Sequence, residues 1–99
     1  MKKFSPTKNF NKSSIDRIPD DKSMVYKIKS ASGKNLYTGI AGRHRGQERL
    51  LEHLNILKEK IPGGTKFQTL HVANKDIAEK IEKQIIKKEN PEYNQQNAR

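Results

Sequence analysis

Cysteine is absent from this chain of 99 residues, so disulfide bonds and thiolate-ligated zinc sites are excluded. No apolar run approaches the ~20 residues that a membrane-spanning helix needs. The Met-Lys-Lys start is not followed by the apolar segment of a secretory signal, so we expect no signal peptide. Hydrophobic residues make up only 31% of the chain, which limits it to a small core and a single domain.

Acidic residues are also scarce, since 11 of them face 21 lysines and arginines, for a formal net charge of +10. Self-repulsion on this scale opposes compaction, and a polyanionic partner relieves it. Nucleic acid is the leading candidate, because each neutralised phosphate releases a condensed counterion. An anionic membrane surface or an acidic protein would satisfy the same charge. Many small ribosome-associated proteins are equally basic without any chemistry of their own, so charge alone leaves the choice open.

The first 23 residues show no hydrophobic periodicity. Their apolar residues stand singly among polar residues and two prolines, a pattern typical of irregular structure. We therefore predict an irregular N-terminal arm or linker over residues 1–23 and one folded domain over residues 24–99.

Strands and helices are predicted within that domain. Residues 24–30 alternate between apolar and basic side chains, and turn residues separate them from a second strand over 36–40, which predicts a hairpin. A leucine stripe predicts a helix over 47–60, ended by a Pro-Gly-Gly sequence. A third strand over 66–72 precedes a helix over 74–88. This β-β-α-β-α order predicts an α/β fold with a small three-stranded antiparallel sheet and flanking helices.

Five short motifs follow one another along the predicted elements. They are Met24-Val25-Tyr26, Tyr37-Thr38-Gly39, the segment from Arg49 to Leu54, the segment from Glu82 to Ile86, and Pro91-Glu92-Tyr93-Asn94. In this order and spacing they resemble the GIY-YIG nuclease family from about residue 24 to residue 94. Met24 stands where the first motif usually has glycine, and Thr38 replaces the middle isoleucine of the second.

The resemblance implies a metal-dependent endonuclease that hydrolyses phosphodiester bonds with Mg²⁺ or Mn²⁺. It implies a GIY-YIG-like fold and a catalytic set made of six residues, Tyr26, Tyr37, Arg49, His53, Glu82 and Asn94. In this set Tyr26 activates water, Arg49 steadies the phosphate and Glu82 holds the metal ion. Tyr37 binds or assists the phosphate, and Asn94 ties the C-terminal tail back to the site.

The chemistry of three of these residues agrees with such roles. Glu82 borders the apolar stripe of its helix, where a partly desolvated carboxylate suits a divalent cation. Arg49 offers a planar, permanently charged fork for a phosphate, and His53 follows it by four residues on the same helix face. The alternatives are structural: a surface ion pair of Glu82 with neighbouring lysines, an ion pair of Arg49 with Glu52, and a boundary histidine without function.

The tyrosines also admit two interpretations. A phenol with an ordinary pKa near 10 is a poor base, so Tyr26 needs nearby cations or a metal-bound water in order to act. Strand tyrosines at these positions also occur simply as half-buried packing residues. Asn94 could equally be an ordinary turn residue.

A nucleic-acid surface is predicted beside the site. Gly39 would allow close approach of backbone or substrate, while Arg43 and Arg45 would extend the phosphate-binding surface. Charged runs of this kind are usually solvated faces, which is the alternative for both arginines. DNA is the expected substrate ahead of RNA.

Little more than a catalytic module fits in the chain, so we expect low sequence specificity. A basic, cysteine-free module of this kind fits the nuclease toxin domain of a larger secreted bacterial effector, which would act in the cytoplasm and be held by an acidic immunity protein. A freestanding phage or mobile-element nuclease fits the same residues. Rival interpretations are a catalytically inactive basic nucleic-acid-binding module and a protein-binding basic domain. No membrane partner is expected.

Overall fold

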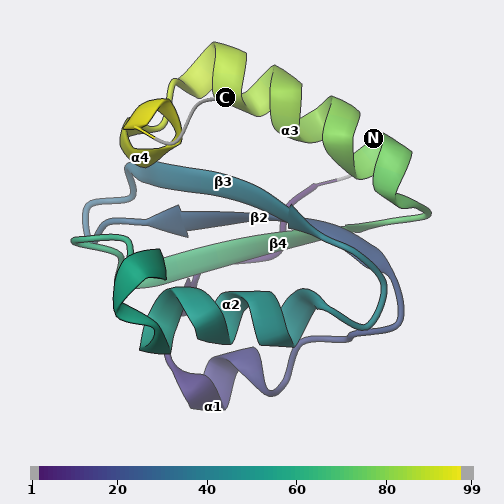
Figure 1. Cartoon of the computed structure of the whole chain (residues 1–99), viewed down its shortest axis with the longest axis horizontal. Helices are drawn as coiled ribbons and strands as arrows, with labels where there is room; N and C mark the ends of the chain where they lie inside the picture. Colours follow the sequence, from purple (N-terminus) through teal and green to yellow (C-terminus); the bar gives the residue numbers. More distant parts are fainter. Residues whose placement is uncertain (1–2, 97–99) are drawn as a thin grey trace.

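The computed structural model describes residues 3–96, and it places an antiparallel sheet between two helical layers (Figure 1). The sheet has four strands in the order β1-β4-β2-β3. Their bounds are Lys8–Asn9 for β1, Ser23–Lys29 for β2, Asn35–Ala41 for β3 and Lys66–Val72 for β4. The three longer strands are those predicted from the sequence, and the α/β class is confirmed. The two-residue strand β1 was not predicted.

Within residues 3–96, five helical elements flank the sheet. They are α1 (Lys12–Ile15), α2 (Gly46–Asn55), the 3₁₀ turn η1 (Leu57–Glu59), α3 (Lys75–Glu89) and α4 (Glu92–Gln96). Figure 1 shows α2 and α1 on one face of the sheet and α3 on the other. In the described part of the chain, none of these helices is long and apolar enough to cross a bilayer.

The helix ends differ from the sequence prediction in one instructive place. The predicted helix over 47–60 stops at Asn55, because Ile56 adopts an extended backbone with ψ of 119° and the chain re-enters helical geometry only as η1. The later helix begins as predicted: the side chain of Asn74 accepts a hydrogen bond from the Ile77 amide. It ends at Asn90, which takes the left-handed conformation common at helix C-termini.

Two apolar clusters lie on the two faces of the sheet. Alternation along β2 sends Tyr26 and Ile28 into one cluster, with Leu50 of α2, and sends Val25 into the other, with Ala78 of α3. Both faces of β2 are therefore covered, which is why this central strand is buried along most of its length. Tyr26, the first predicted catalytic tyrosine, therefore lies on a strand that is packed on both faces.

The N-terminal segment is more ordered than the predicted irregular arm. It contains β1 and α1, and three of its apolar residues, Phe10, Ile15 and Ile18, are buried in the same cluster as Tyr26. These residues show no regular spacing in the sequence because the segment that carries them is mostly irregular, and each reaches the core from a different point along it. The domain boundary at residue 24 stays a prediction.

Met24, at the position where the first motif usually has glycine, is accommodated by another glycine. A Cβ atom at Gly46 would lie 3.0 Å from the sulfur and the terminal methyl of Met24. The buried Met24 side chain thus packs against the start of α2, where the absence of a side chain leaves it room. The β2 backbone keeps its regular pairing, with Met24 opposite Ala41 and His71.

Candidate active site

Tyr26 lies at the centre of the candidate site, fully buried beneath the edge strand β3. It is paired with Gly39, and a Cβ atom at that position would lie 2.5 Å from the Tyr26 hydroxyl oxygen and 2.9 Å from the ring of Tyr37. Gly39 therefore leaves the space through which the phenol crosses β3 toward the sheet edge. Its predicted contact with nucleic acid stays a prediction.

Gly39→Ala is expected to displace the Tyr26 phenol, because no rotation of a methyl group avoids the overlap. We expect the free energy of unfolding to fall by about 1–3 kcal/mol, as in other overpacked cores, and nuclease activity to fall with it. Urea unfolding and a cleavage assay measure the two effects. Gly42→Ala is the matched control for stability, since its Cβ atom would meet nothing within 4 Å. Equal stability of the two variants would contradict the packing role of Gly39.

A hydrogen-bonded chain runs from Tyr26 through His53 to the 3₁₀ turn η1. The Tyr26 hydroxyl lies 2.8 Å from Nε2 of His53, and Nδ1 of His53 lies 2.7 Å from the backbone carbonyl oxygen of Glu59. A carbonyl only accepts, so Nδ1 carries the hydrogen. In neutral His53 the other ring nitrogen, Nε2, then accepts from the Tyr26 O–H. Burial lowers the pKa of His53, with the bond to Glu59 opposing that effect in part, so the ring is neutral at pH 7.

Arg49 approaches the same phenols from α2. Its guanidinium donates to the carboxylates of Glu52 at 2.6 Å and Glu59 at 3.1 Å. Burial raises the pKa of Tyr26 and of Tyr37, while the charge of Arg49 lowers both. Arg49 thus makes the ion pair with Glu52 that was the structural alternative to a catalytic role, and it also faces the two tyrosines.

Glu82 reaches this cluster from α3, on the other face of the sheet. The two faces meet there because β3 is the outermost strand and α3 packs against β3 and β2. A negative charge on Glu82 raises the pKa of both Tyr26 and Tyr37, so its carboxylate lies within electrostatic range of both phenols. The pKa of Glu82 itself is raised by burial and then by Glu79. The charge of Lys83 opposes these effects only in part, so the half-buried carboxylate would gain from a bound cation.

Asn94 closes the outer edge of β3. Its side-chain oxygen accepts from the Thr38 amide at 2.7 Å, and its side-chain nitrogen donates to the Thr38 carbonyl at 2.9 Å. One amide side chain thereby pairs with a strand edge as a neighbouring strand would. Thr38 lies between Tyr37 and Gly39, so this pairing fixes the part of β3 that carries the site.

Asn94→Ala is expected to lower the free energy of unfolding by about 1–3 kcal/mol, because the partly buried Thr38 amide and carbonyl lose their partners. Cleavage should also slow, since Tyr37 and Gly39 lose their fixed position. Urea unfolding monitored by circular dichroism measures the first effect. Asn55→Ala, at an exposed position at the end of α2, is the control. A loss no larger than that of the control would mean that Asn94 does not hold β3.

The predicted arginines of the nucleic-acid surface differ in position. A pocket of about 260 Å³ beside the cluster is lined by Ile40, Ala41, Gly42, Arg45, Arg49 and Lys75. Arg45 thus lies beside the catalytic set and pairs with Glu48. Arg43 is exposed in the turn between β3 and α2. Lys75 was not singled out in the sequence, where it is one of many lysines.

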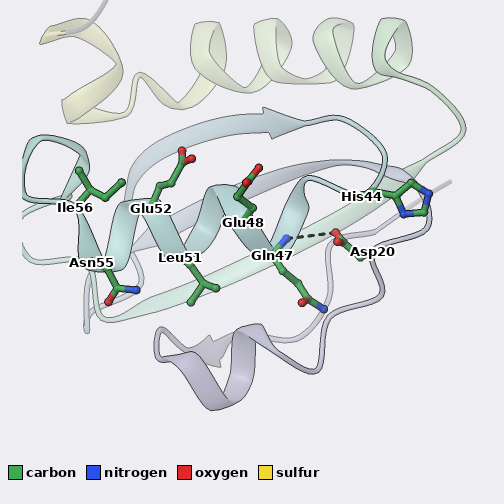
Figure 2. A pocket seen from close by; sticks show the side chains of 8 residues that line it. All are labelled: Asp20, His44, Gln47, Glu48, Leu51, Glu52, Asn55 and Ile56. Atoms are coloured by element: carbon green, nitrogen blue, oxygen red, sulfur yellow. Dashed lines mark hydrogen bonds between the residues drawn. The ribbon is translucent and has the colours of Figure 1, made fainter.

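A larger hollow, of about 470 Å³, follows the outer side of α2 (Figure 2). Its carboxylates already have partners: Glu48 pairs with Arg45, and Glu52 pairs with Arg49. Asp20 accepts from the backbone amides of Gly46 and Gln47 at the start of α2. Asp20 therefore caps α2 from a distant part of the chain, which no local capping pattern reveals. The residues that line this hollow therefore serve to support the site.

Solved structures decide the family. The chain superposes on the magnesium-bound GIY-YIG N-terminal endonuclease domain of UvrC from Thermotoga maritima with a TM-score of 0.70 and 31% identity, covering 83% of this chain and 92% of that one. A point mutant of the same domain, bound to its catalytic divalent cation, gives 0.69 and 30%, covering 82% and 90%. The chain belongs to the GIY-YIG endonuclease family.

The family, the fold class and the enzyme class predicted from the sequence are thereby confirmed. This GIY-YIG chain is a metal-dependent, phosphodiester-hydrolysing nuclease. No protein-family model matches it, and no curated protein does either. The family is therefore carried by the structural likeness together with the motifs.

Sequence reasoning missed one member of the cluster. Glu59 bonds to His53 through its backbone carbonyl and to Arg49 through its carboxylate. The first contact has no sequence signal, because every residue has a carbonyl. The second is a spacing of ten residues that crosses a helix end. The extended residue Ile56 turns the chain after α2, and this turn places Glu59 next to Arg49 and His53.

Proposed function

We propose that this chain is an endonuclease that cuts DNA in preference to RNA, with low sequence specificity, at a site built around Tyr26. The observation that carries the proposal is the buried hydrogen bond from the Tyr26 hydroxyl to His53, with Arg49 and Glu82 within electrostatic range of the same phenol. A buried phenol, a neutral imidazole, a guanidinium and a carboxylate together supply a proton path, a charge clamp and a metal ligand.

The donor set at Glu82 fits Mg²⁺. Mg²⁺ usually binds proteins through one or two carboxylates and keeps waters and substrate phosphates as its other ligands. In the described residues there is no group of three or more histidine, cysteine or acidic side chains that could cage a metal ion. The related UvrC domain binds magnesium. When bound, the ion neutralises charge on the phosphoryl oxygens and lowers the pKa of water.

Water activation proceeds through a proton relay. Burial raises the pKa of Tyr26, so a free tyrosinate is disfavoured before the substrate binds. As water attacks phosphorus, the Tyr26 oxygen takes the water's proton and passes its own proton to Nε2 of His53. The resulting imidazolium keeps its Nδ1–H bond to the Glu59 carbonyl. No charge is left on the phenol, which explains how a tyrosine with a raised pKa acts as a base.

Charge that develops on the phosphate is met by Arg49. Its guanidinium presents several N–H donors in one plane and remains protonated throughout. Only one terminal nitrogen, Nη1, contacts Glu52 and Glu59. These two carboxylates hold the arginine in place, and its other donors lie toward the two tyrosine hydroxyls and the phosphoryl oxygens that would bind there. Tyr37, half-buried next to Tyr26, contributes a hydroxyl to the same oxygens.

The biological setting is proposed from charge and domain content. A net charge of +10 on one small nuclease domain suits the toxin domain of a bacterial effector, delivered into the cytoplasm of a target cell. An acidic immunity protein would cover the basic site in the producing cell. Complementary charge favours fast association of such a pair.

Plasmid cleavage tests the function. Supercoiled DNA should become nicked or linear with the parent protein in Mg²⁺, and EDTA should stop the reaction. RNA of the same sequence, in parallel, should be cut more slowly. Tight, salt-sensitive binding of DNA without any cutting would favour a binding module over an enzyme.

A further inference from the structure

The pocket beside the catalytic cluster is distinguished by its charge. It lies where the end of β3, the start of α2 and the start of α3 come together, at the same end of the sheet in Figure 1. Three basic side chains line it, Arg45, Arg49 and Lys75, and no acidic residue of the described chain belongs to its lining. The remaining lining is Ile40 and Ala41 at the end of β3 and Gly42 just after it, so it includes backbone and a residue without a side chain.

The three cations are engaged to different degrees. Arg45 pairs with Glu48, and Arg49 pairs with Glu52 and Glu59. Lys75 is exposed and has no ion pair among the described residues. The positive charge of the pocket that is free to meet an anion is therefore centred on Lys75.

Lys75 also lies in line with the proposed metal ligand. It precedes Glu82 by seven residues of α3, or nearly two full turns, so both side chains leave the same face of the helix. Along the axis the two residues are separated by about 10 Å at 1.5 Å per residue. Successive phosphates of one DNA strand advance by about 3.4 Å along the duplex axis, so this separation spans about three nucleotides.

We propose that this pocket binds a backbone phosphate of the substrate strand, within about three nucleotides of the cut bond, with Lys75 as its principal ligand and Arg45 on its wall. The inference rests on the proposed nuclease function and deepens it, because it defines the path that the DNA strand takes across the site. The strand runs from Glu82 toward the start of α3, past the open backbone of Gly42.

Binding of DNA by an inactive protein tests the pocket without cleavage. In a Glu82→Gln background, Lys75→Ala should make log Kd depend less steeply on log salt, by about one unit of slope, and should weaken binding several-fold. Lys75→Gln, which keeps length and loses charge, should do the same. Lys80→Ala is the matched control, since Lys80 is exposed on the same helix about 140° further round. Equal slopes for Lys75→Ala and Lys80→Ala would overturn the proposal.

Cleavage by the protein with Glu82 intact locates the bound phosphate relative to the cut bond. A DNA duplex with a single neutral methylphosphonate linkage should be cut poorly at one fixed displacement from that linkage, and Lys75→Ala should lose this interference at that displacement. Persistence of the same interference in Lys75→Ala would assign the phosphate to other residues. If the parent protein cuts no DNA at all, the nuclease function fails, whereas the binding arm still decides the pocket.

Discussion

Glu82→Gln is expected to reduce DNA cleavage in Mg²⁺ by about three orders of magnitude, corresponding to ~4 kcal/mol of lost transition-state stabilisation. Glutamine keeps the shape of the side chain and removes the charge that holds a divalent cation. The fold should be unaffected, because Glu82 makes no ion pair among the described residues and burial already disfavours its charged form. Plasmid nicking under single-turnover conditions measures the loss.

The matched control is Glu79→Gln, an exposed change one turn earlier on the same helix. It should leave cleavage within a few-fold of the parent. Glu82→Gln should still bind DNA at least as tightly, since a negative charge has been removed from a basic protein. Cleavage by Glu82→Gln at the parental rate would remove Glu82 from the metal site and leave the ion without a protein ligand.

Tyr26→Phe is expected to lower kcat by about 10²–10⁴, the usual contribution of general acid–base catalysis. The ring still fills the space beneath Gly39, so the loss isolates the hydroxyl oxygen and its bond to His53. Stability should fall by only about 1–3 kcal/mol, because Nε2 of the buried His53 is left without its partner. His53→Ala should also slow cleavage strongly, while His71→Ala, near the end of β4 and hydrogen-bonded to the Pro19 carbonyl, should not.

The proton relay also predicts the direction of the pH dependence. His53 must be neutral to receive a proton, and burial lowers its pKa below the ordinary 6.5. Activity should therefore be retained at pH 7 and fall only as the pH drops through a value below 6.5. A pH–rate profile under single-turnover conditions measures this. An acid limb centred well above pH 6.5 would contradict a buried neutral His53 as the acceptor.

The motifs and their order were readable because they lie within short stretches of chain. Alternation in β2 and the spacing of apolar residues in α3 each follow from the period of one element, so the sheet and two helices were predictable. Within the site, the spacing of Arg49 and His53 is a property of one helix turn and gave their common face. Charge likewise depends on composition alone, and it indicated a polyanionic partner.

Contacts between segments far apart in the chain could not be predicted from these local patterns. The motifs indicated that Tyr26 and Glu82 belong to one site. Only the fold shows how they meet: β3 is the edge strand, so residues of α3 on one face of the sheet can approach residues on the face covered by α2. Gly39 was predicted to allow close approach of backbone or substrate, and only the fold shows that it makes room for the Tyr26 phenol. Phe10 was assigned to an irregular arm and lies in the core.

By itself, then, the sequence determined the family motifs, the main strands and helices and the strongly basic character of the chain, because local periodicity and composition encode them. Only the tertiary structure decided that His53 is fixed by a carbonyl of Glu59, that Asp20 caps α2 and that Lys75 shares a pocket with Arg45 and Arg49. These depend on backbone atoms and on residues far apart in the chain, and packing of the whole core sets their distances.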